Sequence, residues 1–226
     1  MQVTVFGQTD KRPVIYTLMK IFETMGDTCV ITNNRMYMRL MEDGPGAQGM
    51  YRNVTICVTD ATADEMWDDV DLAPDDFEFV ILDNLYNEDT NLLLYVQGGG
   101  WEADDLYLFD MFEEMVLIQM GKPVKTRPED VIEDTAEEGE EGEPAPKKPA
   151  PKKGFGKRGG KPQPKKSKRP TYLIPYSKDM MANIEKTEFF RMLCPASNEA
   201  ATVVAKVLSK PLKMPVKDLV KVAGGK

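Results

Sequence analysis

A short polar loop near the start of the chain carries the residues best suited to chemistry. It covers residues 7–12 (GQTDKR), between an apolar run at residues 3–6 and an apolar-periodic segment that opens with Pro13. A helix that starts after such a loop can hold an anion, because its first backbone N–H groups lack partners within the helix. The glycine and two cations predict a phosphate site, whereas two solvated surface cations are the simpler interpretation. The candidate residues are Gly7, Lys11 and Arg12.

Apolar periodicity predicts the elements that must position this loop. Residues 13–25 have helical spacing, and Gly26 follows in the position of a left-handed helix cap. Residues 42–49 read as a loop from their composition. Strands are expected at residues 3–6, 28–32, 36–40, 54–58, 77–82, 92–96, 115–119 and 171–174, and further helices at 104–115, 180–186 and 198–208. Apolar strands that alternate with helices predict an α/β fold, with a mostly parallel sheet of about seven or eight strands flanked by helices.

Composition excludes several kinds of active site. The 226 residues include no histidine, which removes imidazole catalysis and histidine metal sites. The three cysteines have no metal-ligand spacing, and Cys29 and Cys57 are expected to be buried thiols in strands. No apolar run approaches the roughly 18 residues that span a bilayer, and no export signal is visible. We expect a cytoplasmic protein, with a peripheral position at the membrane as the alternative.

Two blocks of opposite charge divide the chain. Residues 129–143 hold nine acidic residues and no basic one, and residues 147–169 hold eleven basic residues and no acidic one. Neither block has enough apolar surface to fold, so a disordered linker is predicted. The expected division is 1–127, an N-terminal α/β part; 128–170, the linker; 171–209, the last strand and closing helices of the same domain; and 210–226, a basic tail that is frayed or binds a partner.

The basic block is a candidate surface for nucleic acid or an anionic membrane, through release of counterions. Its only aromatic residue is Phe155, so base stacking is poorly supplied. The alternative is a soluble tether in which the two charged blocks attract each other. The candidate residues are Lys147, Lys148, Lys152, Lys153, Lys157, Arg158, Lys161, Lys165, Lys166, Lys168 and Arg169.

The order of segments resembles the MinD/ParA family of P-loop ATPases, including the CpaE/TadZ-type members that serve pilus assembly. The spacing of the first helix places Lys11 at the family's phosphate-binding lysine. The run 76–83 (DFEFVILD) is similar to its Walker B strand, which implies that Asp83 supports the magnesium water shell; a simple cap of the next turn is the alternative. The run 172–208 is similar to the family's last strand and closing helices.

The loop departs from the family pattern at the residues that matter for turnover. Asp10 replaces the glycine before the lysine, and Arg12 stands where a Ser or Thr hydroxyl would hold Mg²⁺. Pro13 has no N–H to donate, and Asn33 stands where the family has an aspartate after its second strand. These changes predict a degenerate Walker A loop that does not hydrolyse ATP.

The resemblance and these departures predict a non-catalytic scaffold or positioning protein for a larger assembly, such as a pilus, secretion, conjugation or partition apparatus. Protein partners and a homodimer are implied by the same resemblance. One alternative is a nucleotide-binding switch that keeps ATP and Mg²⁺ through Lys11 and Asp83 with weak or no turnover; otherwise no cofactor is expected. The other is a nucleic-acid-binding accessory protein that acts through the basic block.

Overall fold

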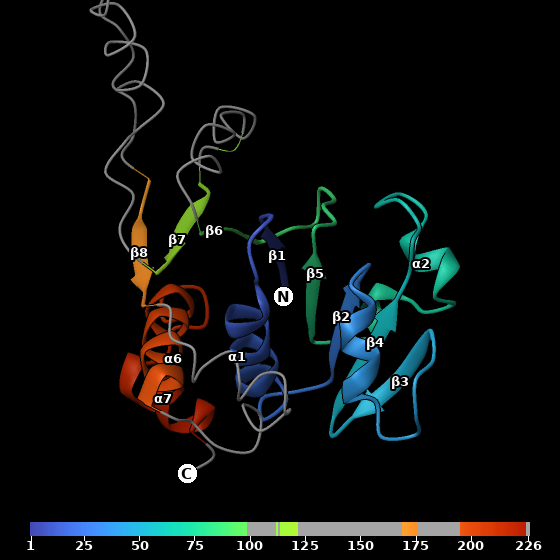
Figure 1. Ribbon diagram of the computed structural model, residues 1–226, viewed down its shortest axis with the longest axis horizontal. Helices are drawn as coiled ribbons and strands as arrows, with labels where there is room; N and C mark the ends of the chain where they lie inside the picture. The colour runs from blue at the N-terminus through green and yellow to red at the C-terminus, as the bar shows by residue number, and fades with distance from the viewer. Residues whose placement is uncertain (99–111, 113, 122–168, 176–194, 225–226) are drawn as a thin grey trace, which may run out of the picture.

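A computed structural model describes residues 1–98, 112, 114–121, 169–175 and 195–224. Its centre is an eight-stranded sheet in the order β3-β4-β2-β5-β1-β6-β7-β8 (Figure 1). Among these strands only β3 and β4 pair antiparallel. The strands are β1 Gln2–Phe6, β2 Thr28–Thr32, β3 Gln48–Tyr51, β4 Val54–Val58, β5 Phe79–Asp83, β6 Leu92–Gln97, β7 Val116–Met120 and β8 Thr171–Ile174. The mostly parallel α/β fold expected from the sequence is confirmed.

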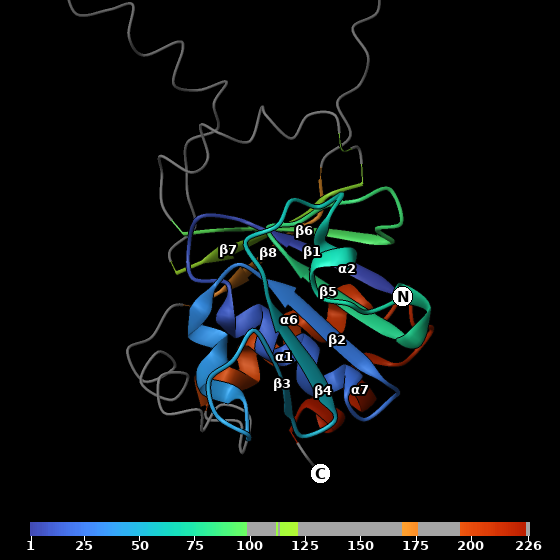
Figure 2. The same ribbon diagram turned by 90° about the vertical axis from the view of Figure 1, so that its right-hand side faces the viewer.

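Helices cover the two faces of the sheet unequally. The helices are α1 Arg12–Phe22, α2 Met66–Asp69, α6 Pro195–Leu208 and α7 Val216–Ala223, with 3₁₀ turns η1 Arg35–Leu40 and η2 Pro74–Asp76. α1 packs against α6 and α7, and together they form the main core with one face of the sheet (Figure 2). α2 packs on the other face through the buried Met66. Successive side chains of a strand point to opposite faces of the sheet, so each strand contributes to both cores. Val30 belongs to the first core, and its neighbour Ile31 belongs to the second.

The three central strands place the candidate site at one edge of the sheet. β2 and β5 are buried along their whole length, as expected for parallel strands covered on both faces. The register aligns Asp83 of β5 with Val5 of β1 on one side and with Thr32 of β2 on the other. The carboxyl ends of these strands therefore bring Asp83 beside the loop that follows β1.

The predicted strand at residues 36–40 is wrong, because this segment is the 3₁₀ turn η1. The Asn34 side chain caps the turn by accepting the Met36 N–H at 3.0 Å. Tyr37 and Leu40 are buried, a spacing of three that fits a 3₁₀ turn and not a strand. The strand that pairs at this edge is β3, which begins inside the predicted loop at 42–49 and pairs with β4.

Two further local predictions are corrected. α1 ends at Phe22 and not near residue 25, and Gly26 is not in a left-handed conformation. A Cβ atom at Gly26 would overlap the Glu78 carboxylate, a flexible side-chain end that can move aside. The tail at 210–226 was expected to be frayed or to bind a partner; it is not frayed, because α7 forms directly after Pro215 and buries Leu219 against the core. Proline at the N-cap costs the helix nothing, because no intrahelical N–H is lost there.

Other expectations lie outside the described residues. These are the helices at 104–115 and 180–186, most of the charged linker, and Cys194. Cys29 and Cys57 are buried free thiols in neighbouring strands, as predicted. Within the described ranges, no helix is long and apolar enough to cross a bilayer.

α1 carries a buried lysine without a partner. Lys20 is 3% exposed, and its ammonium has no hydrogen bond in the described part of the chain. Burial lowers the pKa of Lys20, with Arg52 acting in the same direction and Glu23 opposing both. A buried ammonium without a hydrogen bond costs free energy on folding.

We predict that Lys20→Met raises the free energy of unfolding by about 1 kcal/mol near pH 7. The lowered pKa means that the unfolded state binds more protons than the folded state, so the cost of Lys20 falls as pH rises towards the ordinary lysine value. The gain from the substitution should therefore shrink between about pH 7 and about pH 10. Urea unfolding of the original protein and the variant at both pH values measures the change in the free energy of unfolding. A variant that is less stable than the original protein at pH 7 would contradict the prediction.

Candidate functional site

The loop after β1 is held tightly by the strands beside it. Gly7 has φ 140°, and a Cβ atom there would overlap the Val96 carbonyl oxygen of β6. The Gly7 N–H donates to Asn84 Oδ1 at 3.2 Å, and Asn84 itself has φ 58° just after β5. The chain thus passes between β5 and β6 in a conformation that only glycine adopts readily at position 7.

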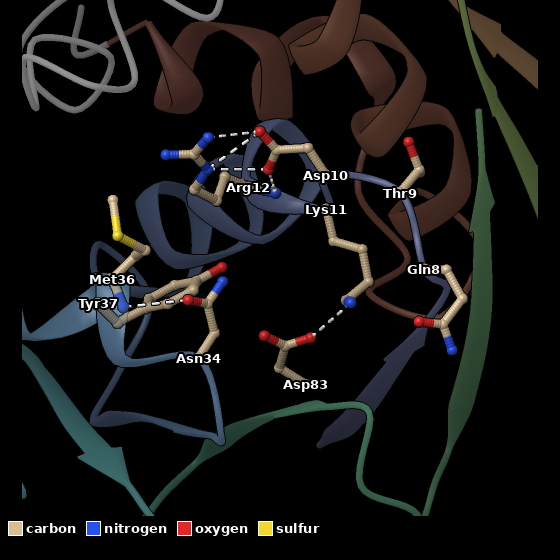
Figure 3. Close-up of a pocket in the computed structure, with 9 residues that line it drawn as sticks. All are labelled: Gln8, Thr9, Asp10, Lys11, Arg12, Asn34, Met36, Tyr37 and Asp83. Atoms are coloured by element: carbon tan, nitrogen blue, oxygen red, sulfur yellow. Dashed lines mark hydrogen bonds and ion pairs between the residues drawn. The ribbon is translucent and has the colours of Figure 1, made fainter. Parts of the chain in front are cut away.

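Lys11 is turned inward and paired with Asp83 (Figure 3). Its ammonium donates to the Gly7 carbonyl oxygen at 2.7 Å and lies 3.2 Å from Asp83 Oδ1. The two side chains are only 10% and 3% exposed, so water screens the pair weakly. Asp83 Oδ2 accepts the Thr32 hydroxyl at 2.7 Å. The cation predicted to hold a phosphate is therefore neutralised inside the protein.

Arg12 is paired with Asp10 in a bidentate ion pair. Arg12 Nε lies 2.9 Å from Asp10 Oδ1, and Nη2 lies 2.6 Å from Oδ2. The hydrogen bond that Arg12 donates to this carboxylate raises the pKa of Arg12, although burial acts against it. Asp10 Oδ1 also accepts the backbone N–H of Arg12 at 3.0 Å. Asp10 thus occupies the donors that a bound phosphate would use.

The first backbone donors of α1, at residues 12–15, are engaged within the protein or absent. Pro13 has no N–H, and the N–H groups of Val14 and Ile15 both donate to the Lys11 carbonyl at 3.0 Å. The Arg12 N–H is taken by Asp10. The anion site that the sequence predicts at this helix end is therefore filled by the protein's own groups. Lys11 and Arg12 are therefore neither solvated surface cations nor unpaired cations.

A pocket of about 370 Å³ opens beside these pairs. Its lining residues are Gln8, Thr9, Asp10, Lys11, Arg12, Asn34, Met36, Tyr37 and Asp83 (Figure 3). Tyr37 is fully buried, and its ring meets Tyr16 of α1 edge-on, with centroids 5.4 Å apart. Burial raises the pKa of the Tyr37 hydroxyl, and the Asp83 charge adds to the rise. The hydroxyl therefore stays protonated across the physiological range.

ATP with Mg²⁺ does not fit this donor set. The Asp10 carboxylate takes the Arg12 N–H and guanidinium, and Lys11 already faces Asp83. Position 12 offers a guanidinium in place of a metal-binding hydroxyl. Among the described residues, no group of three or more Cys, Asp or Glu side chains could hold a metal ion.

The structure brings the four predicted site residues together and pairs their side chains within the protein. Gly7, Lys11 and Asp83 form one contact group, and Arg12 lies at the same pocket. Asp83 is a buried partner of Lys11 and Thr32, not an exposed turn cap. Ten of the eleven basic linker residues lie outside the described ranges; Arg169 is described just before β8, away from this pocket.

Sequence reasoning missed two groups that line the pocket. Tyr37 was assigned to a strand, so its place opposite the loop was not foreseen. Asn34, an N-cap residue type two positions before Met36, was the available signal for a helical turn there. Asn33, singled out by the sequence, is exposed and is not among the lining residues.

Comparison with known proteins supports the fold. No protein-family model matches the chain, and no curated protein sequence matches it significantly. A protein of Borrelia burgdorferi B31 described as a plasmid partition protein, solved bound to AMPPNP, aligns with a TM-score of 0.54 at 9% identity, over 93% of this chain and 98% of that one. The chain shares the fold of this partition protein. The MinD cell division protein of Aquifex aeolicus aligns with a TM-score of 0.45 at 7% identity, over 98% and 94% of the two chains.

We predict that Gly7→Ala lowers the free energy of unfolding by more than 2 kcal/mol, roughly, because the new Cβ meets the Val96 carbonyl and φ is strained. Gly44→Ala is the matched control, since Gly44 also has positive φ, 97°, but no atom within 4 Å of the added Cβ. It should cost about 1 kcal/mol from strain alone. Equal losses in urea unfolding would show that the contact with β6 contributes nothing.

Among the described residues, which form four ion pairs, the Lys11–Asp83 pair should be the strongest. Asp83→Asn leaves the ammonium buried without a charge partner, so a loss of about 2 kcal/mol is expected, whereas Asp60→Asn in the 73% exposed pair with Arg35 should cost under about 0.5 kcal/mol. A double-mutant cycle with Lys11→Met should give a coupling of about 1 kcal/mol or more. Additive losses would rule out a direct interaction.

Proposed function

We propose that this protein is a non-hydrolysing relative of the ParA- and MinD-type ATPases that acts as a scaffold or positioning factor within a larger assembly. The observation that carries the proposal is the internal pairing of both loop cations. Asp83 neutralises Lys11, and Asp10 neutralises Arg12 while also taking the first N–H of α1. Both side-chain cations of the loop, and the Arg12 N–H, are therefore engaged with carboxylates of the chain itself.

The energetics favour this closed state over a nucleotide-bound one. A triphosphate would have to displace Asp10 from Arg12 or lie beside its carboxylate, and like charges at contact distance repel strongly in a partly buried site. The exchange would also leave Asp83, 2% exposed, with its charge uncompensated if Lys11 moved away. Hydrolysis needs in addition a metal hydroxyl ligand that position 12 does not provide.

The kind of assembly is proposed from the fold. A chain that keeps the ParA-type sheet without its nucleotide chemistry retains surfaces for protein partners, including a second copy. The Borrelia relative is described as a plasmid partition protein, so partition is the first candidate apparatus, with pilus, secretion and conjugation machinery as further candidates. Affinity capture of partners from the native host would identify the apparatus.

Thermal unfolding in the presence of nucleotide tests the proposal. Millimolar ATP or AMPPNP with Mg²⁺ should leave the Tm within about 1 °C of the free protein, because a ligand that does not bind the folded state does not stabilise it. No phosphate release above the buffer blank is expected. A rise of several degrees that Lys11→Ala abolishes would instead establish the nucleotide switch.

A further inference from the structure

The exposed lysines of the described chain all lie in one region, which covers the end of α6, the turn after it and α7. They are Lys206, Lys210, Lys213, Lys217 and Lys221. None of them forms an ion pair with another described residue. The only acidic residue within 206–221 is Asp218. We call residues 206–221 the lysine surface, and its positive charge is left almost uncompensated by the helices that carry it.

A second surface of the molecule carries the opposite charge. Residues 60–78, which include α2 and η2, hold nine acidic residues and no basic one. All nine are exposed, and among the described residues only Asp60 of this set is in an ion pair, with Arg35. We call residues 60–78 the acidic surface. Its charge complements that of the lysine surface.

The sheet keeps these two surfaces apart within one copy of the protein. α6 and α7 pack with α1 on one face, and α6 contacts β8 at one end of the strand order. α2 packs on the other face, where Met66 shares a core with Cys57 of β4, near the opposite end. Figure 1 shows α7 and α2 at opposite ends of the sheet. The lysines therefore cannot meet these carboxylates in the same copy, whereas a second copy can supply them.

Each surface also has half-buried apolar side chains among its charges. On the acidic surface these include Trp67 and Leu72, and on the lysine surface Leu212 and Met214. A small apolar centre within a charged rim is the usual arrangement of a protein interface, and tryptophan is frequent at its energetic centre. A lysine ammonium is also attracted to the face of a tryptophan ring. The two surfaces thus match in charge and in their apolar content.

We propose that the lysine surface of one copy binds the acidic surface of a second copy. The contact is head to tail, because the two surfaces differ and lie on opposite faces of the sheet. Each copy in a pair keeps one surface unused, so further copies can add. The inference goes beyond the proposed function and does not depend on it, because neither surface includes a residue of the loop pocket.

Sedimentation velocity of the full chain, without nucleotide, tests the association and its dependence on salt. Exposed ion pairs are individually weak and are screened by salt, so a weak and salt-sensitive contact is expected. In about 20 mM NaCl the average mass should rise above that of the monomer between about 10 and about 300 µM protein. In about 500 mM NaCl, where the Debye length is below about 5 Å, it should return to the monomer. A monomer at every concentration in low salt would overturn the inference.

Two variants with charge changes of equal size test the two surfaces separately. The first variant loses four exposed lysines through Lys206→Gln, Lys210→Gln, Lys217→Gln and Lys221→Gln. The second loses four exposed carboxylates through Asp64→Asn, Asp68→Asn, Asp71→Asn and Asp75→Asn. Each variant alone should associate at least about tenfold more weakly than the original protein. Undiminished association of either variant would overturn the inference.

An equimolar mixture of these two variants identifies the contact. Each variant keeps the surface that the other has lost, so the mixture should form one-to-one pairs with a Kd within about fivefold of the original value and no larger species. A mixture that stays monomeric would overturn the inference, and so would one that forms larger species. The recovery of binding also shows that both variants are folded.

The matched control neutralises four exposed acids outside both surfaces. Its changes are Asp43→Asn, Glu88→Gln, Asp89→Asn and Glu114→Gln. This control should associate at least as well as the original protein, because it alters net charge without altering either surface. A loss equal to that of the second variant would show that net charge alone governs association. Association that nuclease digestion abolishes would show bridging by nucleic acid, and either result would overturn the inference.

Discussion

The ion pair between Lys11 and Asp83 is the interaction on which the site depends. It joins the loop after β1 to the end of β5, two neighbouring strands at the centre of the sheet. Thr32 of β2 donates to the same carboxylate, so three adjacent strands meet at one buried group. Because both charges are almost fully buried, the pair is weakly screened and its geometry is fixed by the sheet register.

The ion pair between Asp10 and Arg12 likewise joins two of the chain's own charges, here at the start of α1. Asp10 lies between the guanidinium and the backbone N–H of Arg12, and so takes the place of an external anion at the start of α1. A loop can therefore keep the shape of a phosphate site while its donors serve the fold. The consequence for function is a pocket of balanced charge, in which each of the two cations is paired with a carboxylate.

The sequence predicted those parts of the fold that follow from local patterns. The β1–loop–α1 unit and the strand ending in Asp83 are read from apolar periodicity, and the parallel sheet follows from strands that are apolar on both faces. η1 was missed because Met36 and Met38 alternate with polar or aromatic residues just as a strand would, and only the Asn34 cap decides otherwise. The pairing of Lys11 with Asp83 depends on strand order, which no local pattern encodes.

The state of the Lys11 ammonium tests the account most directly. NMR of the side-chain ¹⁵Nζ reports its proton exchange with water and its response to Mg-ATP. The account predicts a slowly exchanging signal, protected by Gly7 and Asp83, that does not move when Mg-ATP is added. A rapidly exchanging, solvated ammonium, or a signal that shifts on addition of Mg-ATP, would contradict it.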